Sequence, residues 1–202
     1  HHDKTIIFDL DETLVHCCDS LRENPDTVLK IKFPKGDVIE AGINIRPYAR
    51  ECLEAANEHF EVIVFTASHR AYANVVLDYL DPTGKLIQHR LFREHCIQSR
   101  QGFYVKDLRI FANRKMSQMA IVDNATYSFA NQLDNGIPII SWYDNKEDTE
   151  LKSLITYMED LSKQEDVREL NKITFDLRGF MNQNSDQDIE KLSRKIESFL
   201  LQ

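Results

Sequence analysis

Two aspartates separated by a single residue stand near the start of the chain, directly after a short apolar run. The run is residues 5–8 (TIIF), and Asp9, Asp11 and Thr13 follow it. β-Branched and aromatic residues are typical of a buried parallel strand. Side chains just beyond the carboxyl end of such a strand lie where ligands bind in open α/β sheets. The structural alternative is that Asp11 caps a following helix while Asp9 faces solvent.

Two carboxylates at this spacing can divide one reaction between them. Asp9, held at the end of the strand, can attack phosphorus and form an aspartyl-phosphate. Asp11 can protonate the leaving oxygen and later deprotonate a water molecule. Like charges this close also need a cation, and Mg²⁺ typically binds one or two carboxylates together with a substrate phosphate. The pair therefore predicts Mg²⁺-dependent phosphoryl chemistry.

Composition limits the classes of protein that fit. The 202 residues suffice for one domain with an insert, and the net charge of −8 argues against nucleic acid as a ligand. No apolar run approaches the length of a membrane span, although an anchor upstream of His1 stays open. The four cysteines form no CxxC pair, and residues 16–18 (HCC) lack a second pair of zinc ligands. We expect an intracellular protein, nuclear or cytoplasmic.

Further strands place polar groups at their carboxyl ends. Residues 61–65 form an apolar strand between two helices, at 48–59 and 70–80, and Thr66 follows it. The Thr66 hydroxyl can bind a phosphate oxygen or simply cap the second helix. Residues 119–122 form another strand, and the oxygens of Asp123 and Asn124 beyond it suit a hard cation.

The remaining segments complete an α/β pattern. Lys106 follows an apolar stretch and can neutralise phosphate charge, although most lysines are solvated surface groups. A last core strand at 137–141 precedes an amphipathic helix at 151–161. Strands alternating with helices predict a doubly wound, mostly parallel sheet.

An insert separates the first motif from the first helix. Residues 28–33 alternate between apolar and polar, residues 34–37 (PKGD) form a turn, and 38–45 form the returning strand. This hairpin lies within an insert of about residues 19–45. It is either a wall of a substrate groove or a small extension of the sheet.

Taken together, the polar strand ends resemble the four motifs of the haloacid-dehalogenase superfamily. The Asp-x-Asp-x-Thr pattern is similar to that of its phosphatase branch. Closer still, the chain resembles the small C-terminal-domain phosphatases and dullard, which share the NLI-interacting-factor domain. The matching stretches are residues 8–16, 65–68, 91–94, 104–108 and 122–124, extended by 135–138, 141–144 and 148–151. The resemblance covers about residues 4–163.

The resemblance implies a role for each catalytic position. Asp9 is the nucleophile and a metal ligand. Asp11 is the general acid/base, and its backbone carbonyl also touches the metal. Thr66 and Lys106 bind and stabilise the transferring phosphoryl group.

The same resemblance implies a Mg²⁺ site. Asn124 joins Asp9 and Asp11 as a ligand of the ion. Asp123 stands behind these ligands and holds Lys106.

Members of this family remove phosphate from serine or threonine in proteins, so the implied partner is a phosphoprotein or phosphopeptide. Tyr72 is a candidate wall of an apolar pocket beside the site, and Arg93 is a candidate substrate contact. His69 and Arg70 depart from the family, which more often has an apolar residue there, and would favour a second phosphate. Residues 17–37 also depart, so recognition of the RNA polymerase II tail is not predicted.

The last part of the chain extends beyond the matched domain. Residues 164–180 and 185–201 are typical of two helices, within a C-terminal extension of residues 164–202. They either cover the sheet or offer a partner or dimer contact through the last helix. Two alternative functions remain, a small-metabolite phosphatase and a catalytically silent phosphoprotein-binding scaffold. The small insert disfavours the first, and the filled catalytic positions disfavour the second.

Overall fold

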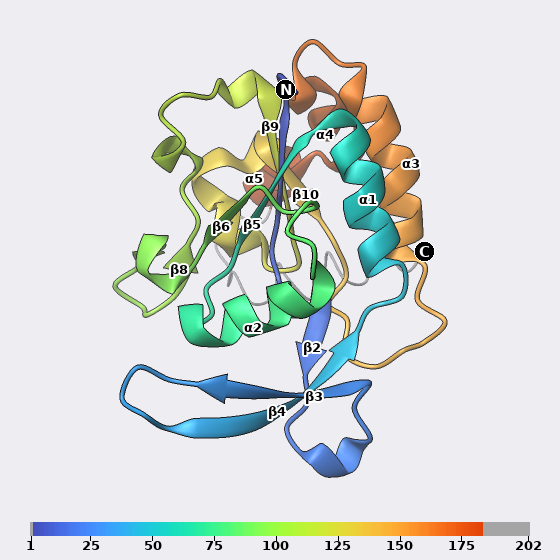
Figure 1. Cartoon of the computed structure of the whole chain (residues 1–202). Helices are drawn as coiled ribbons and strands as arrows, with labels where there is room; N and C mark the ends of the chain where they lie inside the picture. The colour runs from blue at the N-terminus through green and yellow to red at the C-terminus, as the bar shows by residue number, and fades with distance from the viewer. Residues whose placement is uncertain (1, 184–202) are drawn as a thin grey trace.

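A parallel sheet of five strands lies at the centre of residues 2–183, the part of the chain that the computed structural model describes (Figure 1). The strand order is β10-β9-β1-β5-β6. Central β1 pairs with β5 on one side and β9 on the other, with Ile7 opposite Ile63 and Ile121. The strands are β1 Thr5–Phe8, β5 Glu61–Phe65, β6 His89–Leu91, β9 Met119–Asp123 and β10 Gly136–Pro138.

Strand side chains alternate between two apolar layers. Ile6 and Phe8 pack in one layer, under α1 (Ala49–His59), α2 (Arg70–Leu80) and α3 (Glu150–Ser162). Ile7 packs in the other layer, under the 3₁₀ helices η3 (Leu108–Ile110), η4 (Met116–Gln118) and η5 (Thr126–Asn135). Because both faces are covered, the strands are apolar throughout rather than alternating. The predicted doubly wound sheet is confirmed.

The insert folds as a three-stranded antiparallel sheet with the order β2-β4-β3, which projects from the body in Figure 1. Its strands are β2 Val15–Cys17, β3 Thr27–Lys32 and β4 Val38–Ile45, and the 3₁₀ helix η1 spans Leu21–Glu23. The predicted hairpin corresponds to β3 and β4. β2 was not predicted, because three residues are too few to show a period of two.

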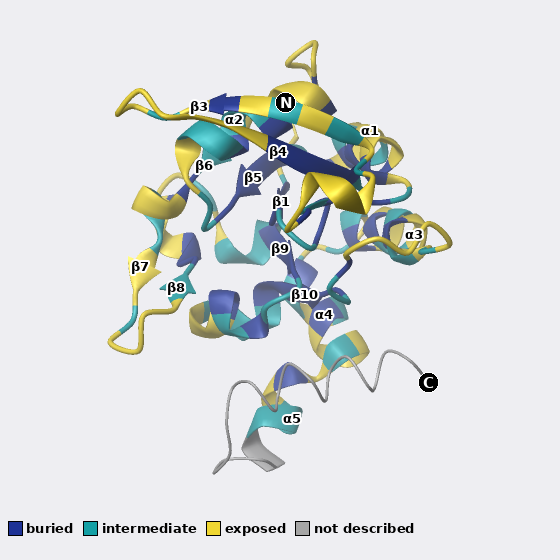
Figure 2. Cartoon of the chain, turned by 90° about the horizontal axis from the view of Figure 1, so that it is seen from below, coloured by how far each residue is buried: buried dark blue, intermediate teal, exposed yellow. Residues whose placement is uncertain are grey.

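A small hairpin lies beyond the edge of the central sheet. The edge strand β6 ends at Leu91, and the 3₁₀ helix η2 (Arg93–His95) follows it. β7 (Ile97–Gln98) and β8 (Tyr104–Val105) then pair, and Gly102, with a φ of 90°, supports the turn between them. Figure 2 shows β7 exposed, in contrast to the buried β1, β5 and β9.

The predicted helix at 164–180 is two helices. α4 (Val167–Phe175) and α5 (Leu177–Gln183) meet at Asp176, whose φ of 40° breaks the helical path. Val167 and Leu177 are buried in the two apolar layers, so this part covers the body. The second predicted helix, at 185–201, and its partner contact lie outside the described residues. Among residues 2–183, no helix combines the length and apolar character that a membrane crossing needs.

Candidate active site

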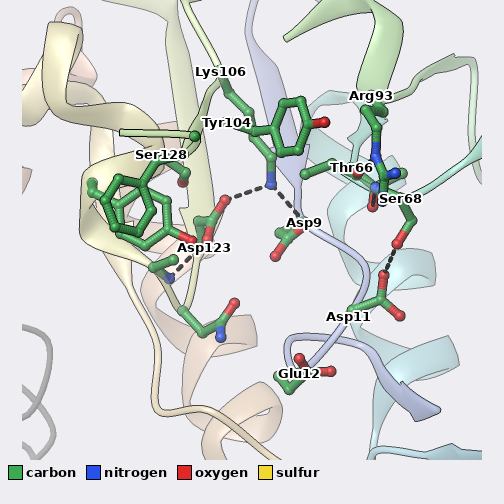
Figure 3. Close-up of a pocket in the computed structure, with 16 residues that line it drawn as sticks. Asp9, Asp11, Glu12, Thr66, Ser68, Arg93, Tyr104, Lys106, Asp123 and Ser128 are labelled. Carbon is green, nitrogen blue, oxygen red and sulfur yellow. Dashed lines mark hydrogen bonds and ion pairs between the residues drawn. The ribbon is translucent and has the colours of Figure 1, made fainter. Parts of the chain in front are cut away.

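A cavity of about 340 Å³ opens at the carboxyl ends of the central strands (Figure 3). It is lined by groups from the ends of β1, β5 and β9, as expected for an open α/β sheet. None of its lining residues comes from β2, β3 or β4, so the insert forms no wall of it. The charged residues of the lining are four carboxylates and two cations: Asp9, Asp11, Glu12, Asp123, Arg93 and Lys106.

The loop after β1 holds the two aspartates in a single tight turn. The Asp9 N–H donates to the Val122 carbonyl at 2.9 Å, and the Leu14 N–H donates to Leu10 at 2.9 Å. Glu12 takes a left-handed conformation with φ of 57°, which reverses the chain directly into β2. Asp11 therefore caps no helix, and the structural alternative for this residue is wrong.

A buried arginine ties this loop to the rest of the molecule. Arg46 is buried, and its guanidinium donates to both carboxylate oxygens of Asp148 at 2.8 and 3.0 Å. Its third contact is with the Thr13 carbonyl at 3.2 Å. A bidentate pair fixes direction as well as distance. Arg46 thus anchors the loop of residues 9–13. This role could not be predicted from the sequence, because the residue lies far from the motif.

The floor of the cavity, which we define as Asp9, Thr66, Lys106 and Asp123, is almost closed to solvent. The Lys106 ammonium lies 2.7 Å from Asp9 and 2.6 Å from Asp123. Burial opposes the charged form of Lys106, but the two carboxylates outweigh it and raise the lysine pKa. Burial and the charge of Asp123 together raise the pKa of Asp9, against the effect of Lys106. The charge of Lys106 therefore does not offset the effect of burial and of Asp123 on Asp9.

Thr66 completes the floor with a hydroxyl group. Its side chain is buried, and its Oγ1 accepts the Ser68 N–H at 3.0 Å, which leaves the O–H proton as a donor. The cap of α2 is supplied by His69, whose Nδ1 accepts from the Ala71 N–H at 3.1 Å. The alternative that Thr66 merely caps the helix is thus wrong.

Asp11 is held from the side of α2. Ser68 Oγ donates to one carboxylate oxygen at 2.5 Å, and the Tyr72 hydroxyl donates to the other at 2.6 Å. Burial and the Asp11 charge raise the pKa of the Tyr72 phenol, so it stays a donor. Ser68 was not predicted as a site residue. The available signal was a second hydroxyl two positions after Thr66, where a strand ends.

The structure brings one of the four candidate substrate contacts into the cavity lining. Arg93 lines the cavity; its Nε donates to the Ala67 carbonyl at 2.7 Å, and its guanidinium lies over the Tyr104 ring at 5.3 Å. Tyr72 is not in the lining, and its hydroxyl contacts Asp11, so it offers more than the apolar wall that was expected.

His69 and Arg70 also lie outside the lining. The His69 ring packs against Phe33 of the insert at 5.2 Å. Arg70 pairs with Glu94 at 2.6 Å and covers the Phe92 ring at 4.5 Å. Both side chains have local partners, and their part in substrate binding stays a prediction.

The oxygen ligands at the cavity suit Mg²⁺. Asn124 donates to Ser141 at 3.0 Å, and its Oδ1 accepts from Thr13 at 3.3 Å with one lone pair still available. Within residues 2–183, no three His, Cys, Asp or Glu side chains converge as a metal site by themselves. Mg²⁺ typically takes only one or two carboxylates and completes its shell with waters and phosphate. The oxygens of Asp9, the Asp11 carbonyl and Asn124 therefore fit the ion.

The sequence matches known phosphatases over most of its length. The model of the family described as "NLI interacting factor-like phosphatase" matches residues 4–168. The Caenorhabditis elegans protein "CTD small phosphatase-like protein 3" is 45% identical over 86% of this chain and 60% of its own length. The human "Carboxy-terminal domain RNA polymerase II polypeptide A small phosphatase 1" is 40% identical over 80% of this chain and 60% of its own length. The chain thus spans little more than half of these relatives.

A solved structure shows the same fold. "The Structure of Fcp1, an essential RNA polymerase II CTD phosphatase" matches with a TM-score of 0.59 and 19% identity, over 90% of this chain and 63% of that one. At this identity the likeness concerns the fold alone. With the family model spanning most of the sequence, the resemblance predicted from the motifs is confirmed: the chain belongs to the NLI interacting factor-like phosphatase family.

Proposed function

We propose that the chain is a Mg²⁺-dependent protein phosphatase that acts on phosphoserine and phosphothreonine through an aspartyl-phosphate on Asp9. The observation that carries this proposal is the floor of the cavity. A buried carboxylate is fixed at 2.7 Å from the buried ammonium of Lys106, beside the hydroxyl of Thr66. A nucleophile, a cation and a hydroxyl donor thus lie together in the buried floor of the cavity.

The reaction takes two steps. An oxygen of Asp9 forms a bond to phosphorus as the bond to the seryl or threonyl oxygen breaks, and Asp11 gives that oxygen its proton. A water molecule then attacks the phosphorus of the aspartyl-phosphate. Asp11 takes the proton from this water, and Asp9 is released as a carboxylate. Ser68 and Tyr72 orient the Asp11 carboxyl group for both proton transfers.

Charge on the phosphoryl oxygens is carried by groups that are already in place. Lys106 is held by Asp9 and Asp123 and needs no rearrangement as the transition state forms. The Thr66 hydroxyl adds a hydrogen bond. Asp9, the Asp11 carbonyl and Asn124 would hold Mg²⁺, which would supply the further positive charge that a phosphate requires in an acidic cavity.

A protein substrate is supported by the position of the insert outside the cavity lining and by the names of the relatives. Within residues 2–183 the insert does not line the cavity, so it does not close over a small molecule there. The human relative is named as a phosphatase of the RNA polymerase II carboxy-terminal domain. For this chain we infer the class of substrate, a phosphorylated serine or threonine in a peptide segment, and leave its sequence to the test.

The proposal is tested by hydrolysis of phosphoserine peptides, with sugar phosphates as the competing substrates. We expect turnover of the peptides with Mg²⁺, loss of turnover with EDTA, and at least a ~10³-fold loss in Asp9→Asn, since removing a nucleophile removes the covalent route. Asp37→Asn, at the exposed turn of the insert, is the matched control and keeps its activity. Full activity of Asp9→Asn, or faster turnover of sugar phosphates, would contradict the proposal.

A further inference from the structure

One side of the cavity is aromatic. Phe103, Tyr104 and Tyr127 line it, and we call these three residues the aromatic wall. The rings of Phe103 and Tyr127 lie 5.0 Å apart with an angle of 50° between their planes. Residues 102–104 and 125–128 include no charged side chain. This side therefore differs from the acidic remainder of the lining.

The aromatic wall lies across the sheet from α2. Its residues come from the β7–β8 hairpin and from η5, which packs on the apolar layer beneath Ile7. α2, which holds Asp11 through Tyr72, packs on the opposite layer. A phosphorylated residue with its phosphate at Asp9 thus lies between α2 and the wall. The residues on either side of it in the peptide must therefore lie next to α2 or next to the wall.

Two observations point to a ligand at the wall. Phe103 remains 37% exposed, although its ring contacts the ring of Tyr127 at a tilted angle. Ser128, next to Tyr127, lines the same cavity and is only 3% exposed (Figure 3). Within the described part of the chain its hydroxyl has no hydrogen-bond partner. A buried hydroxyl without a partner is unfavourable, and a polar group of a bound peptide would satisfy it.

We propose that the aromatic wall is a subsite for an apolar side chain next to the phosphorylated residue of the substrate. The inference rests on the proposed phosphopeptide function and names a determinant of its specificity. Consecutive Cα atoms are only ~3.8 Å apart, so a residue next to the phosphoserine reaches a surface continuous with the cavity. The exposed ring of Phe103 favours apolar groups, and Ser128 lines the same cavity next to Tyr127.

The test compares phosphoserine peptides built from glycine and serine, with leucine placed at one flanking position at a time. We expect leucine at one position to raise kcat/KM about tenfold over glycine, the usual range for filling an apolar pocket. Phe103→Ala should reduce this ratio to below ~3. Ile97→Ala is the matched control, because Ile97 is an exposed apolar residue of the same hairpin outside the lining, and it keeps the ratio.

The same peptides, titrated against Asp9→Asn without turnover, separate the two proposals. If the wild-type chain hydrolyses no peptide, the proposed function fails, while the ratio of leucine to glycine affinities still tests the wall. A ratio near one at every flanking position would overturn the inference. So would a preference that Phe103→Ala leaves unchanged in both assays.

Discussion

The floor of the cavity and its aromatic wall are built in opposite ways. Three floor residues, Asp9, Thr66 and Asp123, stand at the ends of central strands, and all four are at most 8% exposed. Lys106, which follows β8, is held by ion pairs with Asp9 and Asp123. Phe103 and Tyr104 are held instead by a hairpin whose strands have two residues each, and Phe103 is exposed. If the floor binds only the phosphate, the residues of the wall can change without disturbing the floor. Catalysis and substrate specificity would then depend on different residues.

The strongest test of this separation removes a donor from the floor. Thr66→Val keeps the shape of the side chain and deletes its hydroxyl, and we expect kcat to fall about 10²–10³-fold, as for other lost donors to transition-state charge. The loss should be equal for leucine-flanked and glycine-flanked peptides. Thr27→Val in β3 is the control. A change in the ratio between the peptides would show that floor and wall are coupled.

The support beneath the floor should matter for folding. Arg46→Ala leaves Asp148 and the Thr13 carbonyl without their buried partner, and we expect a loss of about 3–5 kcal/mol in the free energy of unfolding. Lys30→Ala, which removes an exposed pair with Glu40, should cost less than ~1 kcal/mol. Urea denaturation measures both. Similar losses in the two variants would mean that burial does not distinguish these pairs.

The floor could be predicted from the sequence because it depends on strand ends. Buried parallel strands are apolar throughout, so the polar residues that follow them are easy to locate, and the sheet brings Asp9, Thr66 and Asp123 to one edge. Strands β1 and β5 and helix α2 were predicted with the bounds that the structure has. Lys106 needed the family resemblance, because nothing local distinguishes it from a surface lysine.

The surroundings of the floor could not be predicted in the same way. The contacts of Tyr72 and Ser68 with Asp11 join residues about sixty positions apart, and no periodic pattern encodes them. The aromatic wall joins Phe103 to Tyr127 across two short irregular segments. The break at Asp176 was also missed, since the apolar spacing continues through it while the backbone does not.

The far end of α2 provides a test of stability without chemistry. Burial opposes ionisation of Asp81, but N–H groups of residues 85–87 and the Thr83 hydroxyl lower its pKa below the usual 3.8. The carboxylate therefore stabilises the fold fully above the unfolded pKa, and this stabilisation is lost as the pH falls through the folded value. We expect Asp81→Asn to cost about 1–2 kcal/mol at neutral pH. The difference from wild type should shrink below about pH 4, and a constant difference in acid denaturation would contradict this account.

The smallest expected effect on activity concerns a residue beside the floor that contacts Asp11. Tyr72→Phe removes one donor to Asp11 and keeps the ring, so we expect kcat to fall about fivefold, equivalent to ~1 kcal/mol for one hydrogen bond, with KM unchanged. Ser68→Ala, which removes the donor to the other carboxylate oxygen, should act in the same way. Both effects follow from the proposed role of Asp11 in proton transfer, which needs an oriented carboxyl group. A raised KM with an unchanged kcat in Tyr72→Phe would instead mean that this residue contacts the substrate, as the family resemblance implied. Residues of α2 would then contribute to substrate specificity.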